Sequence, residues 1–451
     1  MRQSLSLLAC ALLALPVSQA AGAEGETDSA TPAKTPSTNA LETRVTRLIE
    51  ALGADTLKSR TDAERELLDI GPTALDHIPS PETLPTASIR EGVRRIRIEL
   101  ERRKAIESLE PSIVTLRGRR PLSEVLAQIR RQTGNRFDVK ASTEELAAPI
   151  DVDFNRTPFW KALDDVAAKA GLRYATETSE LALEKRPSKA TRADEEVVDY
   201  PGAFRLATTK GMLRPLIGAD DKRLLRGAVR IAAEPRLRPL FLHYAARNIH
   251  IRSSEGHEYA PFTSAAKYEL PLAEGSWLEL TFDVVVPADT LPDTVHVEGT
   301  IGAYTAAGTE EFVFSDLLAK GVSRRKAGVT VRLQQVKFEP QEDGTRTAQV
   351  EMSVVYDVGG PAFESHRTWI YFNGTWLSGK GGVRIAKDPG LNATHQMDGG
   401  IVVEYGFSGL KDDPSTYRFH YAAPTLLIDQ PLHFSLRHVP VERPKPAVMD
   451  K

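Results

Sequence analysis

The chain has 451 residues, of which 26% are charged, and a formal net charge of −3. This length provides for two to four folded domains, and the nearly balanced charge lacks the basic excess by which proteins bind nucleic acid. No apolar run after residue 23 is long enough to span a membrane, and one cysteine in the whole chain excludes a disulfide framework.

The N-terminus predicts a cleavable bacterial secretory signal peptide over residues 1–23. Arg2 supplies the positive start, residues 5–17 are almost entirely apolar, and small residues permit cleavage after Ala20 or Ala23. We therefore expect an exported protein, located in the periplasm, at the cell surface or outside the cell.

The single cysteine, Cys10, lies inside this leader. Cleavage would leave a mature chain without a disulfide, a thiolate nucleophile or a cysteine metal site. The segment Leu7-Leu8-Ala9-Cys10 also resembles a lipobox, so a lipid anchor on Cys10 is the alternative outcome of export.

A helical module follows a polar segment. Residues 24–39 lack large apolar side chains and are expected to be a disordered linker. Over residues 40–110 apolar side chains recur at helical spacing, and we expect capping boxes at Thr61–Glu64 and Ser88–Glu91 to start two of the helices. Gly71 and the proline after it end the helix that the first box would start.

The order of apolar and turn residues from Leu48 to Leu75 resembles a degenerate HEAT-type helical repeat. The resemblance covers about 65 residues, roughly one to one and a half repeats. It implies paired helices, but too few of them to build the long concave surface of a solenoid.

Residues 113–174 contain an internal repeat with an offset of 37 residues. The matched positions include Ile113 with Ile150, Pro121 with Pro158, Leu126 with Leu163, and Gly134 with Gly171. Each half predicts a strand, a helix closed by a left-handed glycine, and a second strand. We expect Thr157 to cap the second helix, with Pro158 in the first helical position. The two halves together predict a β-α-β-β-α-β domain over residues 111–186, with both helices on one face of a small sheet.

The segments Pro121–Leu126 and Pro158–Leu163 resemble the twice-written strand–Pro-Leu-x-x-Ala-Leu–helix pattern of the secretin and TonB-dependent receptor short N-terminal domain. The resemblance covers about 75 residues. It implies a non-catalytic domain that docks other envelope proteins. Because no secretin pore region and no series of barrel strands follows, it favours a docking module and not a channel.

After a polar joint at residues 185–196 the apolar period becomes two. The clearest alternating runs are residues 278–286, 329–333, 350–354 and 432–436. This pattern predicts half-buried antiparallel strands, with a hairpin turn at Asp343-Gly344. We expect tandem antiparallel β-sandwiches over residues 197–318 and 328–442, separated by a basic stretch at 320–326 that interrupts the strands, and a tail over 443–451.

The predicted fold class is therefore a multidomain α+β chain. It joins a short α-helical, HEAT-like module, the β-α-β-β-α-β domain and tandem antiparallel β-sandwiches. This plan resembles a set of uncharacterised exported bacterial multidomain proteins, a likeness that includes the segment Gly359–Arg367. The resemblance implies no activity.

Local catalytic motifs fail in their context. Gly374–Gly381 is close to a phosphate-binding loop, but Gly381 stands where a hydroxyl must hold magnesium, and strand residues follow where a helix is needed. A glycine-rich hairpin turn is the better interpretation. Gly406–Gly409 lacks the spacing of a serine nucleophile elbow, and the carboxylates at Asp412-Asp413 are expected in a turn.

The histidines do not form a local metal motif. His243, His250 and His257 are spaced by seven, and in one extended strand an odd spacing places neighbours on opposite faces. We therefore predict no catalytic, cofactor-binding or metal-binding residues and no cofactor.

Two surface stretches are candidates for binding. Arg367, Trp369, Tyr371 and Trp376 belong to the densest aromatic segment. Core filling is the favoured interpretation of these rings, and they are the candidate binding platform if the protein binds a glycan or a partner. The arginines of residues 90–104 predict a solvated helix face, with contact to an anionic envelope polymer as the alternative.

The sequence as a whole predicts an exported, non-catalytic envelope protein that acts as a binding, docking or structural module. Envelope proteins or a cell-surface polymer are the expected partners, with no nucleic acid and no transmembrane segment after signal cleavage, and no oligomeric state is assigned. The alternatives are a secreted hydrolase with a dispersed carboxylate site on a β-sandwich, and an accessory component of a secretion or uptake complex.

Overall fold

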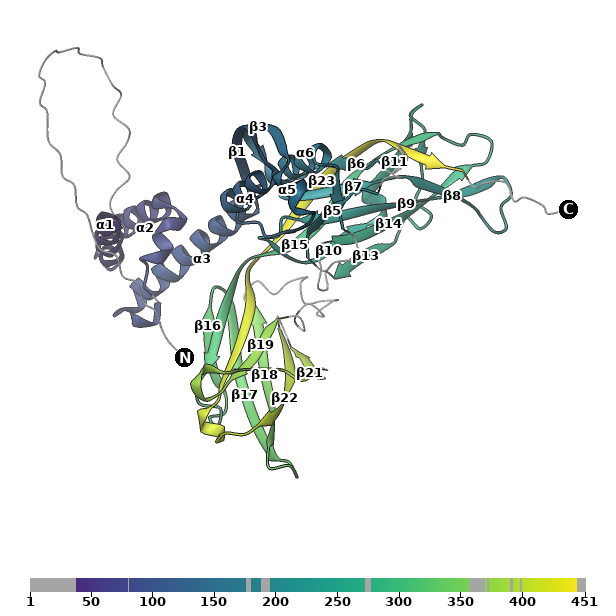
Figure 1. The fold of residues 1–451 in the computed structure, drawn as a ribbon. Coiled ribbons are helices and arrows are strands. Elements are labelled where there is room, and N and C mark those ends of the chain that lie inside the picture. The colour runs from purple at the N-terminus through teal and green to yellow at the C-terminus, as the bar shows by residue number, and fades with distance from the viewer. Residues whose placement is uncertain are drawn as a thin grey trace, which may run out of the picture.

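A computed structural model describes residues 38–79, 81–175, 180–187, 195–271, 277–356, 370, 373–389, 392–397 and 400–443. The predicted signal peptide and nearly all of the predicted linker lie outside these residues. The chain is a mixed α+β protein in which N-terminal helices precede small sheets with helices and then large sheets (Figure 1). Among the described residues, none of the helices combines the length and the apolar character that a membrane span requires.

Three α-helices and two short 3-10 helices form the N-terminal module. They are α1 (Thr38–Ala51), α2 (Leu57–Ile70), η1 (Pro72–Asp76), η2 (Pro81–Thr83) and α3 (Ala87–Leu109). Apolar side chains at helical spacing close a small core, with Val45, Leu67, Val93 and Leu100 fully buried. Gly71 ends α2 with a φ of 82°, as its position before a proline predicted.

Both predicted capping boxes are wrong, the first by five residues and the second by two. The hydroxyl of Thr56 accepts the backbone N–H of Ser59 at 3.1 Å and begins α2, whereas Thr61 lies inside the helix and donates to the carbonyl of Leu57. Thr86 likewise begins α3, so Ser88 is a helical residue. In each case an earlier threonine reaches the free N–H groups first, and the helix extends back to it.

The repeat domain is built from β1 (Ile113–Pro121), α4 (Leu122–Thr133), β2 (Asp138–Lys140), α5 (Thr143–Ala147), β3 (Pro149–Pro158), α6 (Phe159–Lys169), β4 (Leu172–Tyr174) and β5 (Ala182–Lys185). The two strand–helix–strand halves are confirmed. The single small sheet is not, because β1 pairs only with β3 while β5 lies between β2 and β4 in a second sheet. Helices α4 and α6 bury their apolar faces in one core with both sheets.

The internal repeat becomes a pseudo-symmetric pairing of β1 with β3, in which Ile113 faces Pro158 and Pro121 faces Pro149. Helices α4 and α6 begin directly after Pro121 and Pro158, which have extended backbone conformations. Thr157 is therefore a strand residue paired with Val114, and it does not cap the helix as predicted. Gly134 and Gly171 adopt left-handed conformations with φ of 69° and 65°, as predicted.

Each repeat helix also protects the outer edge of a strand. The side-chain amide of Gln132 in α4 bonds both backbone groups of Thr115, and Lys169 in α6 donates to the carbonyl of Asp151. Gln132 and Lys169 are equivalent positions of the repeat. Such contacts blunt exposed strand edges that would otherwise pair with other chains.

The β-region contains a 13-stranded sheet with mixed pairing and an antiparallel 5-stranded sheet. Its strands are β6 (Val197–Asp199), β7 (Phe204–Thr208), β8 (Gly211–Pro215), β9 (Lys222–Ala233), β10 (Arg238–Ala245), β11 (Ile249–Ser253), β12 (Glu258–Tyr259), β13 (Lys267–Pro271), β14 (Trp277–Pro287), β15 (Thr294–Phe314), β16 (Val322–Lys326), β17 (Val329–Pro340), β18 (Arg346–Tyr356), β19 (Gly374–Ser378), β20 (Arg384–Ala386), β21 (Asn392–Met397), β22 (Gly400–Leu410) and β23 (Arg418–Glu442). Among the described residues, short 3-10 helices lie between them at η4 (Ala246–Asn248), η7 (Lys380–Gly382) and η8 (Pro414–Thr416).

Two long strands hold the β-region together. Strands β15 and β23 pair from Thr294 with Pro440 to Phe314 with Phe419. Their one end, with Val297 and Leu436, lies in the core of a first β-lobe built on β6–β14. Their other end, with Phe312 and Tyr421, lies in the core of a second β-lobe built on β16–β22. The two lobes are therefore connected by one continuous pair of strands, β15 and β23 (Figure 1).

The basic stretch at residues 320–326 does not interrupt the strands as expected. Val322–Lys326 is itself strand β16, at the edge of the 5-stranded sheet and paired with β17. Ala327 and Gly328 connect the two strands with φ of 43° and 75°, and positive φ at both positions of a tight turn matches the twist of a hairpin. The lysine and arginine side chains then serve on an edge strand, where charge discourages aggregation.

Two predicted turns are confirmed. Gly344 has a φ of 83° in the hairpin that joins β17 to β18, where Asp343 accepts the N–H of Thr345 at 2.9 Å. The glycine-rich loop after Gly374 joins the antiparallel strands β19 and β20 as a hairpin, so it opens no helix to hold a phosphate.

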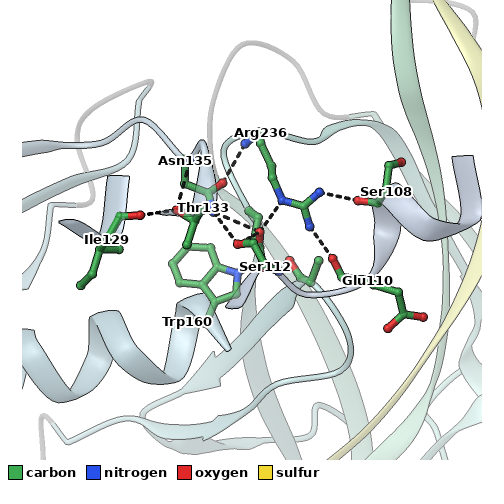
Figure 2. A network of polar contacts seen from close by, with 10 residues as sticks. Ser108, Glu110, Ser112, Ile129, Thr133, Asn135, Trp160 and Arg236 are labelled. Atoms are coloured by element: carbon green, nitrogen blue, oxygen red, sulfur yellow. Dashed lines mark hydrogen bonds and ion pairs between the residues drawn. The ribbon is translucent and has the colours of Figure 1, made fainter. Parts of the chain in front are cut away.

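A buried polar network fixes the repeat domain to α3 and the first β-lobe (Figure 2). Glu234, at the end of β9, is 0% exposed and accepts hydrogen bonds from the N–H and hydroxyl of Ser112, from Asn135 and from Arg236. Arg236 also donates to the carbonyls of Ser108 and Glu110 at the end of α3. The Glu234 carboxylate and the Arg236 guanidinium are thus hydrogen-bonded to neighbouring parts of the chain.

A second polar cluster lies on the other side of the same joint. Arg205 of β7, whose side chain is 4% exposed, pairs with Asp164 of α6 at 2.9 Å and with Glu196 at 2.6 Å. The phenols of Tyr174 and Tyr200 both donate to Asp164, and desolvation raises the pKa of each phenol. The repeat domain is consequently a fixed part of the molecule and not a separately tethered unit.

Candidate functional site

The predicted binding platform is only partly described. Arg367, Trp369 and Tyr371 lie outside the described residues. Trp376 on β19 is half-buried, with His420 of β23 stacked on its ring at 5.0 Å and Arg384 of β20 over the ring at 4.1 Å. Because β19 lies between β20 and β23, Arg384 and His420 come from the two neighbouring strands and both contact the indole, which is therefore engaged within the fold.

The histidines of the first β-lobe contradict the sequence expectation. His243 in β10 and His250 in β11 lie on the same face of the sheet, because they pair with Gly302 and Glu298 of β15, four residues apart. The helical turn η4 between the two strands absorbs the odd spacing. The argument for opposite faces assumed one unbroken strand, and that assumption is wrong.

This outer face of β10, β11, β13, β15 and β23 is the candidate functional site. It carries an open cleft of about 560 Å³. The residues that line the cleft come mainly from β10, β13, β15 and β23 and comprise Phe241, His243, Tyr244, Lys267, Tyr268, Glu269, Thr300, Tyr304, Asp429 and Pro431, with Asn248 from η4. A cleft of this size with an aromatic wall and a few polar groups matches the usual form of a small-ligand site.

One pair of stacked rings lies on this face. Phe241 stacks on Tyr304 with ring centroids 4.5 Å apart, and Phe241 is buried. Tyr244 stacks on Tyr268 at 4.8 Å, but these two residues pair across β10 and β13 next to the pair of His243 with Glu269, so their rings lie on the opposite face of the sheet. The Tyr304 ring is held in place by Phe241 and offers aromatic surface at little entropic cost to binding.

The polar centre of the cleft is a pair formed by His243 and Asp429. The imidazole Nε2 lies 3.0 Å from the carboxylate although β15 separates the two strands. The ring reaches across because residue 302 is glycine, where an added Cβ would lie 2.0 Å from Nε2. Gly302 is thus required for this contact and not for a turn.

We expect the substitution Gly302→Ala to displace the His243 ring and to break its contact with Asp429, while the fold is retained because the ring can rotate outward. The measurement is the pH titration of the His243 ring by NMR, in which the raised pKa should return toward about 6.5. Gly344→Ala, in an exposed hairpin turn, is the control that leaves this titration unchanged. An unaltered His243 pKa in Gly302→Ala would contradict the assigned geometry.

The contact with Asp429 makes the stability contribution of His243 depend on pH. The hydrogen bond to Asp429 raises the pKa of His243, and the charges of Asp429 and Glu269 act in the same direction, whereas burial lowers it. The contribution is therefore complete below the unfolded-state pKa and is lost as the pH rises through the folded-state pKa. Both side chains are more than a third exposed, so solvent screening limits the effect to below about 1 kcal/mol.

We accordingly expect His243→Gln to lower the free energy of unfolding at about pH 5.5 and to have almost no effect at about pH 9. Urea denaturation at the two pH values measures the difference. A larger loss at high pH than at low pH would show that the imidazole is held in its neutral form.

Further histidines line the same face, each with its own partner. His250 lies 2.9 Å from Glu258, His433 lies 2.9 Å from Thr300, and His296 lies 2.8 Å from Ser435. Across the residues that the structure describes, no three histidine, aspartate or glutamate side chains converge closely enough to hold a metal ion. The chemistry that this face offers is hydrogen bonding and ring contact, with two carboxylates, Glu269 and Asp429, in the cleft.

A second, more apolar groove adjoins the cleft. It encloses about 730 Å³ between α3 and the middle of β23, and Asp429 and Pro431 line both spaces. From α3 it receives Ile98, Ala105, Ile106 and Leu109, which share one helix face, and from β23 it receives residues 426–428. Ile98 and Ile106 are 51% and 45% exposed, so this apolar stripe is not fully covered by the rest of the fold.

The arginines of α3 have structural partners. Arg90, Arg97 and Arg103 donate to the backbone carbonyls of Leu84, Ile78 and Leu68 at 2.8–2.9 Å. Three of the cations considered for an anionic polymer are thus occupied in closing the helical module.

The cleft lies outside the residues proposed from the sequence. In the sequence, only the spacing of His243 and His250 indicated this face. The turn η4 between the two strands makes that spacing uninterpretable when one unbroken strand is assumed. Glu269 and Asp429 come from strands that are distant in sequence and meet only through β15, so no local motif could indicate them.

Comparisons with known proteins do not assign this chain to a family. No family model matches the sequence, and no curated protein is similar to it. Among solved structures, a conserved domain protein from Bacillus anthracis is similar at 7% identity over 54% of this chain and 90% of that chain, with a TM-score of 0.16. The Salmonella SPI-1 type III secretion injectisome basal body, with proteins InvG, PrgH and PrgK, is similar at 8% identity over 75% of this chain and 93% of that chain, with a TM-score of 0.14. Scores this low support no argument about fold or function.

Proposed function

We propose that this chain is an exported, non-catalytic binding protein of the bacterial envelope, and that the cleft around His243 holds a glycan ligand. The helical module and the repeat domain form its rigid N-terminal part, and two β-sandwich lobes present the ligand site. The observation that carries the proposal is the pairing of a rigid aromatic surface, Tyr304 stacked on Phe241, with hydrogen-bonding groups in one open cleft.

The groups in the cleft suit a polyhydroxylated ligand. The carboxylates of Glu269 and Asp429 accept hydrogen bonds from hydroxyl groups, while Asn248 both donates and accepts. The half-buried ring of Tyr304 provides a flat apolar contact for the C–H groups of a sugar ring. Lys267 and protonated His243 add donors, so neither sign of charge dominates the cleft.

Equilibrium binding of soluble envelope oligosaccharides to the purified chain tests this proposal. The probes are muropeptides from peptidoglycan and the oligosaccharide of lipopolysaccharide, measured by titration calorimetry. We expect Tyr304→Ala to weaken binding about tenfold or more through the loss of aromatic contact. Trp376→Ala, at the platform predicted from the sequence, is the matched control and should leave the affinity unchanged. No binding of any probe, or equal losses in both variants, would overturn the proposal.

A secreted hydrolase is the second candidate, because two carboxylates and a histidine face the same cleft. General acid–base cleavage of a glycosidic bond needs two carboxyl groups on either side of the bond. If the wild-type chain cleaves the bound oligosaccharide, and Glu269→Gln and Asp429→Asn each abolish cleavage, the protein is an enzyme and the binding-only proposal is wrong.

An accessory role in a secretion or uptake complex is the third candidate, supported by the secretin and TonB-like pattern of the repeat domain. The polar outer face of β1 and β3, which carries Arg117 and Asp153 paired at 2.6 Å, would be the docking surface. Cross-linking in native cells followed by recovery of a secretin or outer-membrane receptor would support this role.

Export itself is tested by cell fractionation and mass analysis of the mature N-terminus. We expect cleavage after Ala20 or Ala23, whereas a lipid-modified N-terminal Cys10 would replace a soluble protein by an anchored one. An uncleaved chain in the cytoplasm would contradict the envelope assignment.

A further inference from the structure

We propose that the groove between α3 and β23 holds the alkyl chain of an amphiphilic ligand whose polar head lies in the cleft around His243. This inference rests on the proposed function and names the ligand class as a glycolipid-like amphiphile. It follows from three features of the groove: its apolar lining, its continuity with the cleft, and the change of polarity along it.

The lining of the groove is apolar where it is deepest. Ala105 and Leu109 of α3 are 1% and 3% exposed and form the floor, whereas Ile98 and Ile106 stand at the open side. Leu426, Leu427 and Ile428 of β23 face them. Ile98 and Ile106 are eight residues apart, or about 12 Å along the helix, so the groove provides an extended channel and not a single hole.

The groove and the cleft meet at one point of β23. Asp429 and Pro431 line both spaces, so a ligand can cross from one to the other without leaving the surface. On the cleft side of Asp429 the lining holds His243, Lys267 and Glu269. On the groove side the lining is mainly apolar, with the polar residues Glu101, Arg102, Glu110 and Gln430 among it. One polar end joined to one apolar channel matches a molecule with a hydroxyl-rich head and a hydrocarbon tail.

The polar groups beside the groove do not compete for its floor. Glu101 of α3 pairs with Arg97 at 3.3 Å, and burial raises the pKa of Glu101. Arg102 pairs with Glu99 at 3.8 Å and is 68% exposed, so it can move away from the apolar stripe. An alkyl chain therefore meets apolar side chains without leaving a charge uncompensated.

A series of alkyl maltosides from hexyl to decyl, each below its micelle concentration, tests the inference by titration calorimetry with the full chain. Each buried methylene should tighten binding about fourfold, as expected for about 0.8 kcal/mol per methylene. The double substitution Ile98→Asn with Ile106→Asn should abolish this dependence on chain length and leave the affinity for maltose itself unchanged. Leu318→Asn, at a leucine that is 62% exposed outside the groove, is the matched control.

The outcomes separate the two proposals. If maltose or an envelope oligosaccharide binds, but the affinity of the alkyl maltosides does not depend on the length of the alkyl chain, the alkyl-chain inference is overturned and the proposed function still stands. Failure of every glycan and every maltoside to bind would overturn both. A second copy of the chain as the occupant would appear as a dimer in sedimentation that Ile98→Asn with Ile106→Asn converts to monomer, and this result would also overturn the inference.

Discussion

Replacing Glu234 with alanine is expected to lower the free energy of unfolding by about 3–5 kcal/mol, the range for removing one partner of a buried, hydrogen-bonded charge. Glu234 is fully buried and accepts from Ser112, Asn135 and Arg236. Without its carboxylate, four donor groups of these three residues lose their acceptor inside the joint between the repeat domain and the first β-lobe. A buried donor left without a partner carries the full cost of its desolvation.

Urea denaturation followed by circular dichroism measures this loss. Glu234→Gln keeps the shape and one acceptor oxygen, so we expect a smaller loss than for alanine. Glu91→Ala, which removes a glutamate that is 55% exposed and paired with Arg94, should change stability by less than about 0.5 kcal/mol. A Glu234→Ala variant as stable as the Glu91→Ala variant would show that the network does not hold the joint together.

The substitution Asp164→Ala is expected to produce the second large loss, about 3 kcal/mol. Asp164 is the common acceptor for Arg205, Tyr174 and Tyr200, and the aromatic ring of Tyr174 lies 4.7 Å from the guanidinium of Arg205. Glu196 still pairs with Arg205 after the substitution, which keeps the expected loss at the lower end of the range.

Asp165→Ala supplies the control at the next position of the same helix. Asp165 is 39% exposed and pairs with Lys169, so its removal should cost less than about 1 kcal/mol. Tryptophan fluorescence reports the difference directly, because Trp160 and Trp277 lie 6.0 Å apart beside Tyr174. Equal stabilities for the Asp164 and Asp165 variants would contradict the assigned role of the buried cluster.

The sequence predicted the elements whose signals are local. Helical spacing identified the buried stripe of α3, and the offset of 37 residues identified the two strand–helix–strand halves with their glycine caps. Alternating apolar residues identified β14, β17 and β18. The errors at Thr61, Ser88 and Thr157 have one cause, since several residues within five positions of one another could cap a helix and only the folded backbone selects among them.

The candidate site depended on contacts that no local pattern contains. His243 and Asp429 are 186 residues apart and meet only because β15 pairs with β10 on one side and with β23 on the other. The role of Gly302 is likewise invisible without that register, because a glycine inside a strand has no fixed meaning. The sequence placed the binding platform at Trp376, whose ring the structure covers with Arg384 and His420.

The most direct test of the proposed binding cleft is the NMR signal of the His243 ring during titration with the envelope oligosaccharide that binds. His243→Gln assigns the signal, and His77, in the helical module, provides an internal control. We expect the His243 resonances to shift and to saturate with the affinity measured by calorimetry, while those of His77 stay unchanged. Saturable binding that leaves His243 unshifted and moves other histidines would place the ligand elsewhere and contradict the account.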